Sequence, residues 1–236
     1  MNPSYLSPEP NTGGVEESET GDAAAQWRHV DPPALSAILS AALDAFSENG
    51  FHGASVRDIC HRVGVTLPTL YYHHKNKEGL LLDLLEYSTG DVVARAQAAS
   101  AAGGENCVLQ LANVIEAIVL PMTIRSRLAA VEGEVRYLSP ENRSRYRVVR
   151  RGVEDIVLRI VEDGQERGVF RVIDPRETTR AMLAMCQAIP RWYDAAGPMT
   201  PETVAQKYVE IALTMVGCVN EARDTNRAEK IAPNVH

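Results

Sequence analysis

Hydrophobic residues recur at intervals of three and four along most of the chain after residue 31. Leu35, Ile38, Leu39, Ala42 and Phe46 form one such series. This spacing places the apolar side chains on one face of an α-helix, which can then pack against a core. The pattern predicts long helices over residues 32–48, 76–101, 105–123, 139–167, 174–194 and 200–219. Strand-like alternation is nearly absent, so we predict an all-α fold.

Several of these helices share one predicted start, a residue that can cap the helix followed by a proline. The pairs are Asp31–Pro32, Ser139–Pro140, Asp174–Pro175 and Thr200–Pro201. Asp174 and Glu177 also have the spacing of a capping box, in which each side chain bonds the other residue's backbone amide. Pro121 interrupts an apolar helix, which predicts a break or kink that opens space for a ligand.

Residues 55–74 predict two short helices joined by a tight turn. Ser55 and Asp58 have the spacing of a capping box, and Gly64 suits a left-handed helix end. Thr66 can cap the second helix, which is too short and too polar to be stable alone. We expect Leu70 to anchor that helix inward. The segment therefore predicts a helix-turn-helix unit.

The second short helix exposes side chains suited to DNA. Short and aromatic groups can enter a major groove, and hydroxyl or imidazole groups can meet phosphates. These side chains are Leu67, Thr69, Tyr71, Tyr72 and His73. Two other interpretations stay open, a buried aromatic corner and a metal site at the paired histidines. The metal site is disfavoured, because neighbours in a helix point about 100° apart, and we predict no metal and no cofactor.

The run GFHGASVRDICHRVGVTLPTLYYHHKNKEGLL, residues 50–82, resembles the helix-turn-helix of TetR-type transcriptional repressors. The resemblance implies an N-terminal three-helix DNA-binding domain followed by a helical ligand-binding and dimerisation domain. It implies phosphate contacts from Ser55, Thr66, Tyr71, His73 and Lys77. It implies base-edge contacts from Leu67, Pro68 and Tyr72, with Arg57 able to make either kind. His74 stands where the family commonly has Phe, so we expect it to be buried and hydrogen-bonded or the local packing to differ.

Composition sets limits on these interpretations. The net charge is -7 over 236 residues, so phosphate binding must rely on hydroxyls and backbone amides as well as on basic side chains. Four well-separated cysteines suggest apolar fillers rather than a disulfide framework.

Residues 1–30 have the composition of a disordered acidic tail with no secretion signal, which predicts a cytoplasmic protein without a membrane span. We expect the DNA-binding domain at 31–78, the ligand-binding and dimerisation domain at 79–222, and a C-terminal tail at 223–236.

The middle helices, residues 77–167, mix aliphatic side chains with scattered polar ones, as around an apolar pocket with a few orienting contacts. The candidate ligand contacts are Tyr87, Asn113, Glu116, Arg125, Tyr137, Arg143, Tyr146, Arg147 and Arg150. Core packing explains most of them equally well, and Arg150 with Glu154 or Arg151 with Asp155 can form ordinary surface ion pairs. Residues 134–168, with Arg191, Trp192 and Tyr193, also resemble the TetR branch that controls fatty acid and sterol breakdown, which implies an acyl-CoA effector.

The last two long helices carry apolar stripes with many small residues, which permit close helix approach. The candidate dimer contacts are Met182, Met185, Trp192, Tyr208, Ile211 and Met215. These stripes can instead face the protomer's own core, and the TetR resemblance favours pairing across a two-fold axis. The sequence thus predicts a homodimeric regulator, a repressor, that binds a palindromic double-stranded DNA operator and is released by a small apolar effector. The alternative is a helical enzyme or carrier of apolar molecules without a DNA role.

Overall fold

The computed structural model describes residues 26–218. Most of the predicted N-terminal tail (1–30) and the whole of the predicted C-terminal tail (223–236) lie outside this range. Within this range the chain forms nine α-helices and three short 3₁₀ helices and no strand, as the apolar pattern predicts. The elements are η1 (Gln26–Arg28), α2 (Ala37–Gly53), α3 (Val56–Val63), α4 (Leu67–His73), α5 (Lys77–Ala102), α6 (Cys107–Ile124), α7 (Ser126–Ala130), η2 (Val131–Tyr137), α8 (Pro140–Glu166), α9 (Pro175–Gln187), η3 (Ile189–Arg191) and α10 (Pro201–Met215).

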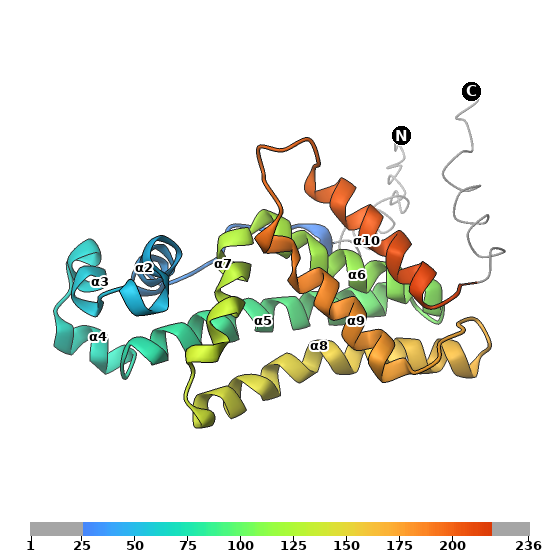
Figure 1. The fold of residues 1–236 in the computed structure, drawn as a ribbon, viewed down its shortest axis with the longest axis horizontal. Helices are drawn as coiled ribbons and strands as arrows, with labels where there is room; N and C mark the ends of the chain where they lie inside the picture. The colour runs from blue at the N-terminus through green and yellow to red at the C-terminus, as the bar shows by residue number, and fades with distance from the viewer. Residues whose placement is uncertain (1–25, 219–236) are drawn as a thin grey trace, which may run out of the picture.

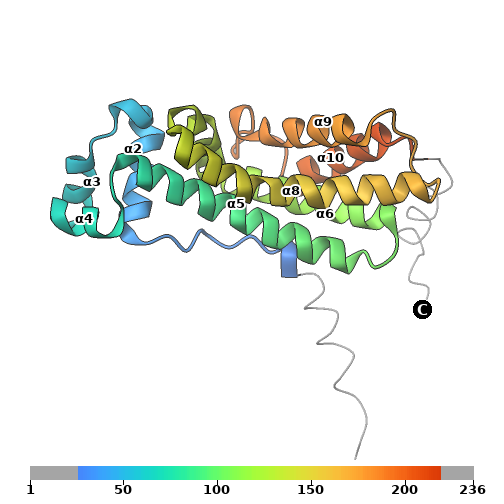
Figure 2. The same cartoon turned by 90° about the horizontal axis from the view of Figure 1, so that it is seen from below.

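The helices form an elongated molecule with two parts. The three short N-terminal helices α2, α3 and α4 lie together at one end, and α5 runs from them along most of the length (Figure 1). The later helices α6 and α8 pack along the other half of α5, and α9 and α10 pack on α8 and α6 (Figure 2). Helix α5 therefore connects the two ends through continuous hydrogen-bonded backbone, which suits transmission of a movement.

Two hydrophobic clusters correspond to these parts, and α5 contributes to both. Leu80 and Leu84, near its start, pack with Phe46 of α2 and Ile59 of α3. Its later residues, such as Val92, join the cluster built around α6. The first cluster also takes in Leu128, Val131, Leu138 and Tyr146. The core around the N-terminal helices thus continues past residue 78, the predicted domain boundary.

The central helix of the second cluster is α6, which runs through the core. Its mean hydropathy of 1.8 over Cys107–Ile124 would satisfy the length and composition of a membrane span, and 67% of that window is buried by the rest of the protein. Burial of this kind is expected of a core helix covered on several sides.

The predicted proline starts hold for three helices. Ser139, Asp174 and Thr200 each accept a hydrogen bond from a backbone N–H in the first turn that follows, with proline at the helix start. These caps satisfy amides that the helix itself leaves free. The reciprocal half of the capping box at Asp174 does not form, because the Glu177 side chain pairs with Arg180 instead.

The predicted start of the first long helix was wrong by several residues. The helix begins at Ala37, where the Ser36 hydroxyl accepts a hydrogen bond from the N–H of Leu39. Pro32 stands before Pro33, and a residue before proline is disfavoured in the helical region. The Asp31 carboxylate binds His29 instead of capping a helix. The other end is as predicted, since Gly50 takes a positive φ of 67° that interrupts the helix.

Residues 26–36 form an ordered N-terminal strap, although residues 26–30 were expected to belong to a disordered tail. Trp27 is 4% exposed and packs in the second cluster. Arg95 of α5 donates hydrogen bonds to the carbonyls of Trp27 and His29. The strap then runs beside α5 to the start of α2 (Figure 2). One buried aromatic side chain and hydrogen bonds from α5 thus fix a segment whose composition is otherwise that of a flexible chain.

The positions of two prolines relative to the helix ends also differ from the predicted ones. Helix α6 continues through Pro121 to Ile124, so the proline lies in the last turn rather than at a break in the middle. Helix α9 ends at Gln187, several residues before the predicted end at 194, and Pro190 lies in the 3₁₀ turn that follows. A proline cannot donate to the carbonyl one turn earlier, which favours helix ends at both places.

Candidate functional site

The helix-turn-helix unit forms as predicted around Gly64. This glycine ends α3 with φ 71° and ψ 28°, in the left-handed region that other residues rarely enter. Thr66 caps α4 by accepting a hydrogen bond from the N–H of Thr69 at 3.4 Å. The capping box at the start of α3 does not form: the Ser55 side chain makes no cap bond, and Asp58 binds Arg62.

One side of α4 is anchored and the other faces solvent. Leu70 is fully buried in the first cluster, as predicted, while Tyr71 is 47% and Tyr72 86% exposed. Among the candidate DNA contacts, Leu67 and Lys77 are half-buried. The exposed ones are Ser55, Arg57, Thr66, Pro68, Thr69, Tyr71, Tyr72 and His73. The exposed tyrosines contradict the alternative of a buried aromatic corner.

Lys77 has structural contacts of its own. Its Nζ donates hydrogen bonds to the carbonyls of His52 at 3.3 Å and Ala54 at 3.0 Å, and it lies 4.7 Å from the ring centroid of Phe51. The ammonium group therefore satisfies carbonyls at the end of α2 and fixes that end against the start of α5.

His74 follows the first of the two expectations made for it. Its ring is half-buried, and Nδ1 lies 2.6 Å from the Asp83 Oδ2 atom of α5. His73 points its ring to solvent next to Tyr72. The paired histidines thus have separate environments, and residues 26–218 contain no group of three metal-ligating side chains that could hold an ion.

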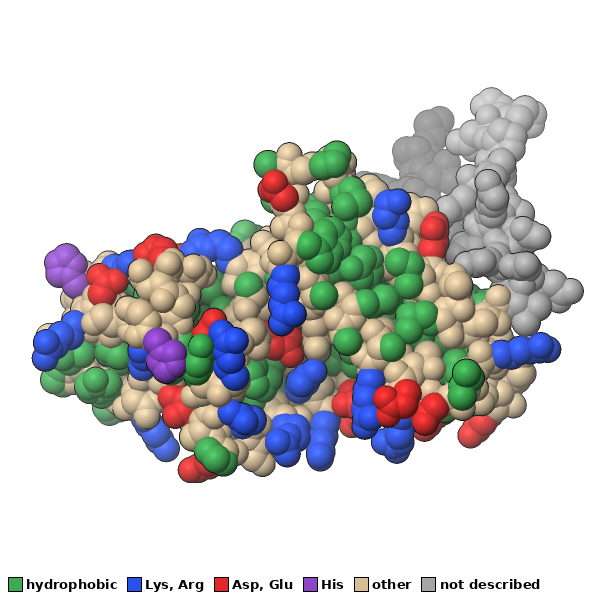
Figure 3. Space-filling view, in the orientation of Figure 1, with side chains coloured by type: hydrophobic (Ala, Val, Ile, Leu, Met, Phe, Trp, Pro, Cys, Tyr) green, Lys and Arg blue, Asp and Glu red, His purple; other side chains and the backbone are tan. Residues whose placement is uncertain are grey.

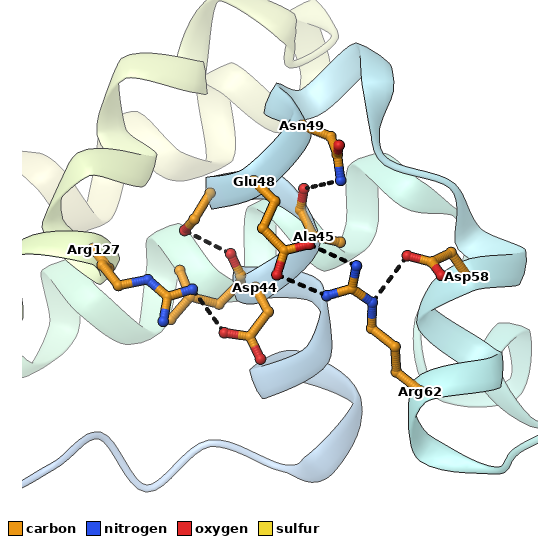
Figure 4. A network of polar contacts seen from close by, with 9 residues as sticks. Asp44, Ala45, Glu48, Asn49, Asp58, Arg62 and Arg127 are labelled. Atoms are coloured by element: carbon orange, nitrogen blue, oxygen red, sulfur yellow. Dashed lines mark hydrogen bonds and ion pairs between the residues drawn. The ribbon is translucent and has the colours of Figure 1, made fainter.

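An ion-pair network fixes α3 against α2 (Figure 4). Arg62 binds the Glu48 carboxylate with both terminal nitrogens, at 2.7 and 3.0 Å, and binds Asp58 at 2.9 Å. The hydrogen bonds from Arg62 lower the pKa of Glu48. The bidentate geometry makes Arg62 a support for the orientation of α3.

A cavity of about 300 Å³ lies among α5, α6, α7, η2, α8 and α9. Most of its wall is aliphatic, with Leu85, Val92, Ile118, Met122 and Leu183 among the lining residues. The polar lining residues are Ser88, Thr89, Glu132, Tyr146, Arg150, Glu154, Arg180 and Gln187. An apolar cavity with a few polar groups is the usual form of a small-molecule site.

Polar contacts run across one wall of this cavity. The hydroxyls of Thr89 and Tyr146 lie 2.9 Å apart. Arg150 Nε lies 3.4 Å from Glu132 Oε1, and Arg150 Nη2 donates to Gln187 Oε1 at 3.1 Å. Burial raises the pKa of Glu132, an effect that the charge of Arg150 partly offsets. Burial and the nearby Glu132 charge also raise the pKa of Tyr146.

Of the nine candidate ligand contacts, Tyr146 and Arg150 line the cavity and seven do not. Four of the seven hold other parts of the protein together. Tyr87 accepts a hydrogen bond from the N–H of Ala34 in the strap. Asn113 and Glu116 bind Arg28, and Arg125 pairs with Asp91 at 3.0 Å.

The remaining three candidates also lie away from the cavity. Tyr137 stacks on Phe51 of α2 with ring centroids 5.4 Å apart. Arg143 donates to the carbonyls of Arg136 and Leu138. Arg147 is exposed and forms no ion pair within residues 26–218. Arg150 pairs with Glu132 rather than with Glu154, the partner that helical spacing predicts.

Glu132, Thr89 and Gln187 were not among the predicted ligand contacts, although they lie beside Tyr146 and Arg150 in the cavity wall. Glu132 belongs to a 3₁₀ turn, where no helical periodicity marks an inward face. Thr89 and Gln187 look like ordinary polar residues of long helices. Their place in the cavity wall follows from the packing of the helices against one another, which local sequence patterns do not give.

Hydrophobic side chains gather over α9, α10 and the loop between them (Figure 3). Trp192 is 45% and Ile211 46% exposed, and Trp192 stacks on Tyr208 with ring centroids 6.3 Å apart. Met185 and Met215 are half-buried nearby. Met182, also a candidate dimer contact, is fully buried in the protomer's own core, because its side of α9 faces inward. We call the exposed group, Met185, Trp192, Tyr208, Ile211 and Met215, the apolar face.

Two family models match the chain. The model described as "Bacterial regulatory proteins, tetR family" matches residues 38–84. The model described as "Tetracyclin repressor-like, C-terminal domain" matches residues 105–216. The first range holds the helix-turn-helix, and the second holds the helices from α6 to α10.

Individual relatives agree with these matches. The chain is 26% identical over 178 residues to the HTH-type transcriptional repressor KstR2 of Rhodococcus jostii (strain RHA1), covering 75% of this chain and 87% of the relative. A tetR-family regulatory protein from Rhodococcus RHA1 has a similar solved structure, with a TM-score of 0.72, 28% identity and coverage of 78% and 96%. AibR, solved in complex with isovaleryl coenzyme A and operator DNA, shares the fold with a TM-score of 0.67, 23% identity and coverage of 78% and 98%. The chain belongs to the TetR family of bacterial transcriptional regulators.

Proposed function

We propose that this regulator is a repressor that binds a palindromic DNA operator through α3 and α4. The observation that carries the proposal is the arrangement of α4, which buries Leu70 and exposes Tyr71 and Tyr72 beside each other. Hydroxyl, imidazole and backbone amide groups on this surface would contact phosphates, and Leu67, Pro68 and Tyr72 would face base edges. This mode of binding does not require a basic protein.

The apolar face on α9 and α10 supports a homodimer. Large apolar groups such as Trp192 and Ile211 remain exposed together there, and such patches mark interaction surfaces. Pairing across a two-fold axis would present two copies of α4 to half-sites about one turn of DNA apart. Two weak contacts linked in one dimer would then bind the operator far more tightly than either alone.

The cavity among α5 to α9 supports control by a small apolar effector. Its size and aliphatic wall suit the acyl part of a thioester, and AibR shows that this fold admits an acyl-CoA. We therefore propose an acyl-CoA thioester as the effector class. Effector and DNA would oppose each other's binding by the same factor, since the coupling free energy is shared.

Membership of a family of transcriptional regulators decides against the alternative of an enzyme. A carrier without a DNA role would fill the cavity yet leave α4 without a partner. Because bacterial DNA lies in the cytoplasm, the proposal also places the protein there.

The proposal can be tested without a known operator. Selection of duplexes from a random library, followed by a gel shift at several salt concentrations, should yield a palindrome bound by the dimer in a salt-dependent manner. Tyr72→Ala should weaken the shift, and an added acyl-CoA should release the wild-type complex. Failure to enrich any duplex would contradict the proposal.

A further inference from the structure

A second, smaller hollow adjoins the ligand cavity. It has a volume of about 240 Å³, and Gly133, Val135, Pro190 and Arg191 are among its lining residues. Four residues line both spaces: Ala129, Glu132, Arg150 and Gln187. The polar contacts between Glu132, Arg150 and Gln187 therefore lie at the boundary between the two spaces.

The contacts at this boundary are weak. Arg150 is 52% and Glu132 27% exposed, and their closest atoms are 3.4 Å apart, so the ion pair is longer than a good charge-assisted hydrogen bond. The partner on the other side, Gln187, is neutral. Because the Arg150 side chain is half exposed, its guanidinium group can turn from both partners towards one ligand group.

The charges around the smaller hollow favour an anion. Arg150 of α8 and Arg191 of η3 line it, and the single carboxylate in its lining is Glu132. That carboxylate is in an unfavourable place, because burial disfavours its charged form. The larger cavity adds Arg180, which is already paired with Glu177, and Glu154. An incoming anion would therefore meet the guanidinium groups of Arg150 and Arg191 and one weakly placed carboxylate, Glu132, which pairs with Arg150.

We infer that the two spaces form one site for an amphipathic anion. The apolar part of the ligand fills the larger cavity, and its anionic group replaces the Glu132 carboxylate on Arg150 and pairs with Arg191. The inference deepens the proposed effector site and rests on it. A fatty carboxylate and a phosphate-bearing acyl thioester share this chemistry. The Glu132 carboxylate competes with either anion for Arg150, and it does not compete in this way with a neutral ligand.

Calorimetric titration of the full chain tests the inference with three probes: octanoate, octanoyl-CoA and 1-octanol. Glu132→Gln removes the competing charge and should tighten binding of the anionic probes about tenfold, while Arg150→Gln and Arg191→Gln should weaken it by a similar factor. Binding of 1-octanol should not change in any of them. A response by octanoate alone identifies a carboxylate ligand, a response by octanoyl-CoA alone identifies a phosphate-bearing one, and either supports the inference.

Arg176→Gln is the matched control, because Arg176 is exposed at the start of α9 and lines neither space. It should bind every probe as the wild type does. Equal effects of Glu132→Gln on 1-octanol and on the anions would overturn the inference, as would binding of none of the probes. Thermal melts confirm that each variant is folded, and Arg191→Gln, at a surface position, keeps the test valid if a variant at the boundary does not fold. Operator selection with the same proteins does not depend on ligand binding. Loss of DNA binding in that experiment would contradict the proposed function rather than the anion site.

Discussion

Arg127 of α7 and Asp44 of α2 form an ion pair of 2.8 Å that joins the helices around the cavity to the helix-turn-helix unit (Figure 4). The next two residues after Arg127, Leu128 and Ala129, line the ligand cavity. Helix α7 thus touches the proposed effector cavity with one side and α2 with the other. A shift of α7 on ligand binding would be passed to α2 through this contact.

Arg127→Ala should therefore weaken the coupling between effector and operator more than it weakens either binding event. Both side chains are substantially exposed, so the pair contributes only about 0–1 kcal/mol to stability. The measurement is operator affinity, by fluorescence anisotropy, with and without saturating effector. The ratio of the two affinities should move towards one in the variant. An unchanged ratio would show that the coupling runs through other contacts, such as those of the strap.

Tyr72→Ala should reduce DNA affinity about tenfold or more while leaving the fold intact. The side chain is 86% exposed, and exposed substitutions usually change stability by less than about 0.5 kcal/mol. Leu70→Ala is the informative contrast, because the loss of this fully buried side chain should cost about 2–5 kcal/mol and unfold α4. Circular dichroism melts and operator titrations on both variants separate contact from folding.

Local signals in the sequence were enough for the presence of the long helices, the turn at Gly64 and the caps at Thr66, Ser139 and Thr200, although two helix ends lay several residues from the predicted positions. Each of these depends on residues within one or two turns of the chain. The outward face of α4 was also predictable, since Leu70 alone provides its apolar anchor. For the helix-turn-helix unit, the sequence therefore predicted mainly local geometry.

The ligand site was much less predictable, because its polar groups meet through long-range packing. Asn113 looks like a pocket residue in an apolar helix, yet its partner is Arg28, far away in the chain. Arg150 looks like one of several surface arginines, yet its partner Glu132 comes from a 3₁₀ turn. The strap was missed for the same reason, since the composition around Trp27 gives no sign of the core that receives it.

Trp27→Ala should lower the free energy of unfolding by about 3–5 kcal/mol, the usual cost of removing a buried large aromatic side chain. A disordered tail would tolerate the same change. Chemical denaturation of the two proteins measures the difference, and Ile173→Ala is the control, because Ile173 is fully exposed and its loss should cost almost nothing. Equal stability of wild type and Trp27→Ala would show that the strap does not hold the core.

Ile211→Arg should convert the proposed dimer to monomers. A charge at the centre of the apolar face would have to be buried without a partner on association. Because Ile211 is 46% exposed in the protomer, the fold itself should survive. Sedimentation velocity gives the mass, and DNA affinity should fall with it. Ile173→Arg, which adds the same charge away from the face, should remain dimeric, and persistence of the dimer in Ile211→Arg would place the interface elsewhere.

Glu132 and Glu78 should give opposite dependences of stability on pH. Burial raises the pKa of Glu132 above its value in the unfolded chain. Ionisation of Glu132 therefore opposes folding, so the favourable contribution of its neutral form is present at low pH and is lost as pH rises through the folded-state pKa. Glu132→Gln cannot ionise, so it should be more stable than wild type at about pH 8 and no more stable at about pH 4.

Glu78 has the reverse balance. Burial alone would raise its pKa, but hydrogen bonds from the Ser139 N–H at 2.7 Å and the Asn142 amide at 2.6 Å outweigh that effect and lower the pKa. The stability that its carboxylate provides is present above the unfolded-state pKa and is lost as pH falls through the folded-state value. Glu78→Gln should therefore be less stable than wild type at about pH 8, with the difference shrinking towards about pH 3. Denaturant titrations of both variants across this range test the two predictions. A change in the free energy of unfolding at neutral pH that has the same sign in both variants would contradict the assigned environments. Only the poorly paired carboxylate of Glu132 opposes folding when it is charged.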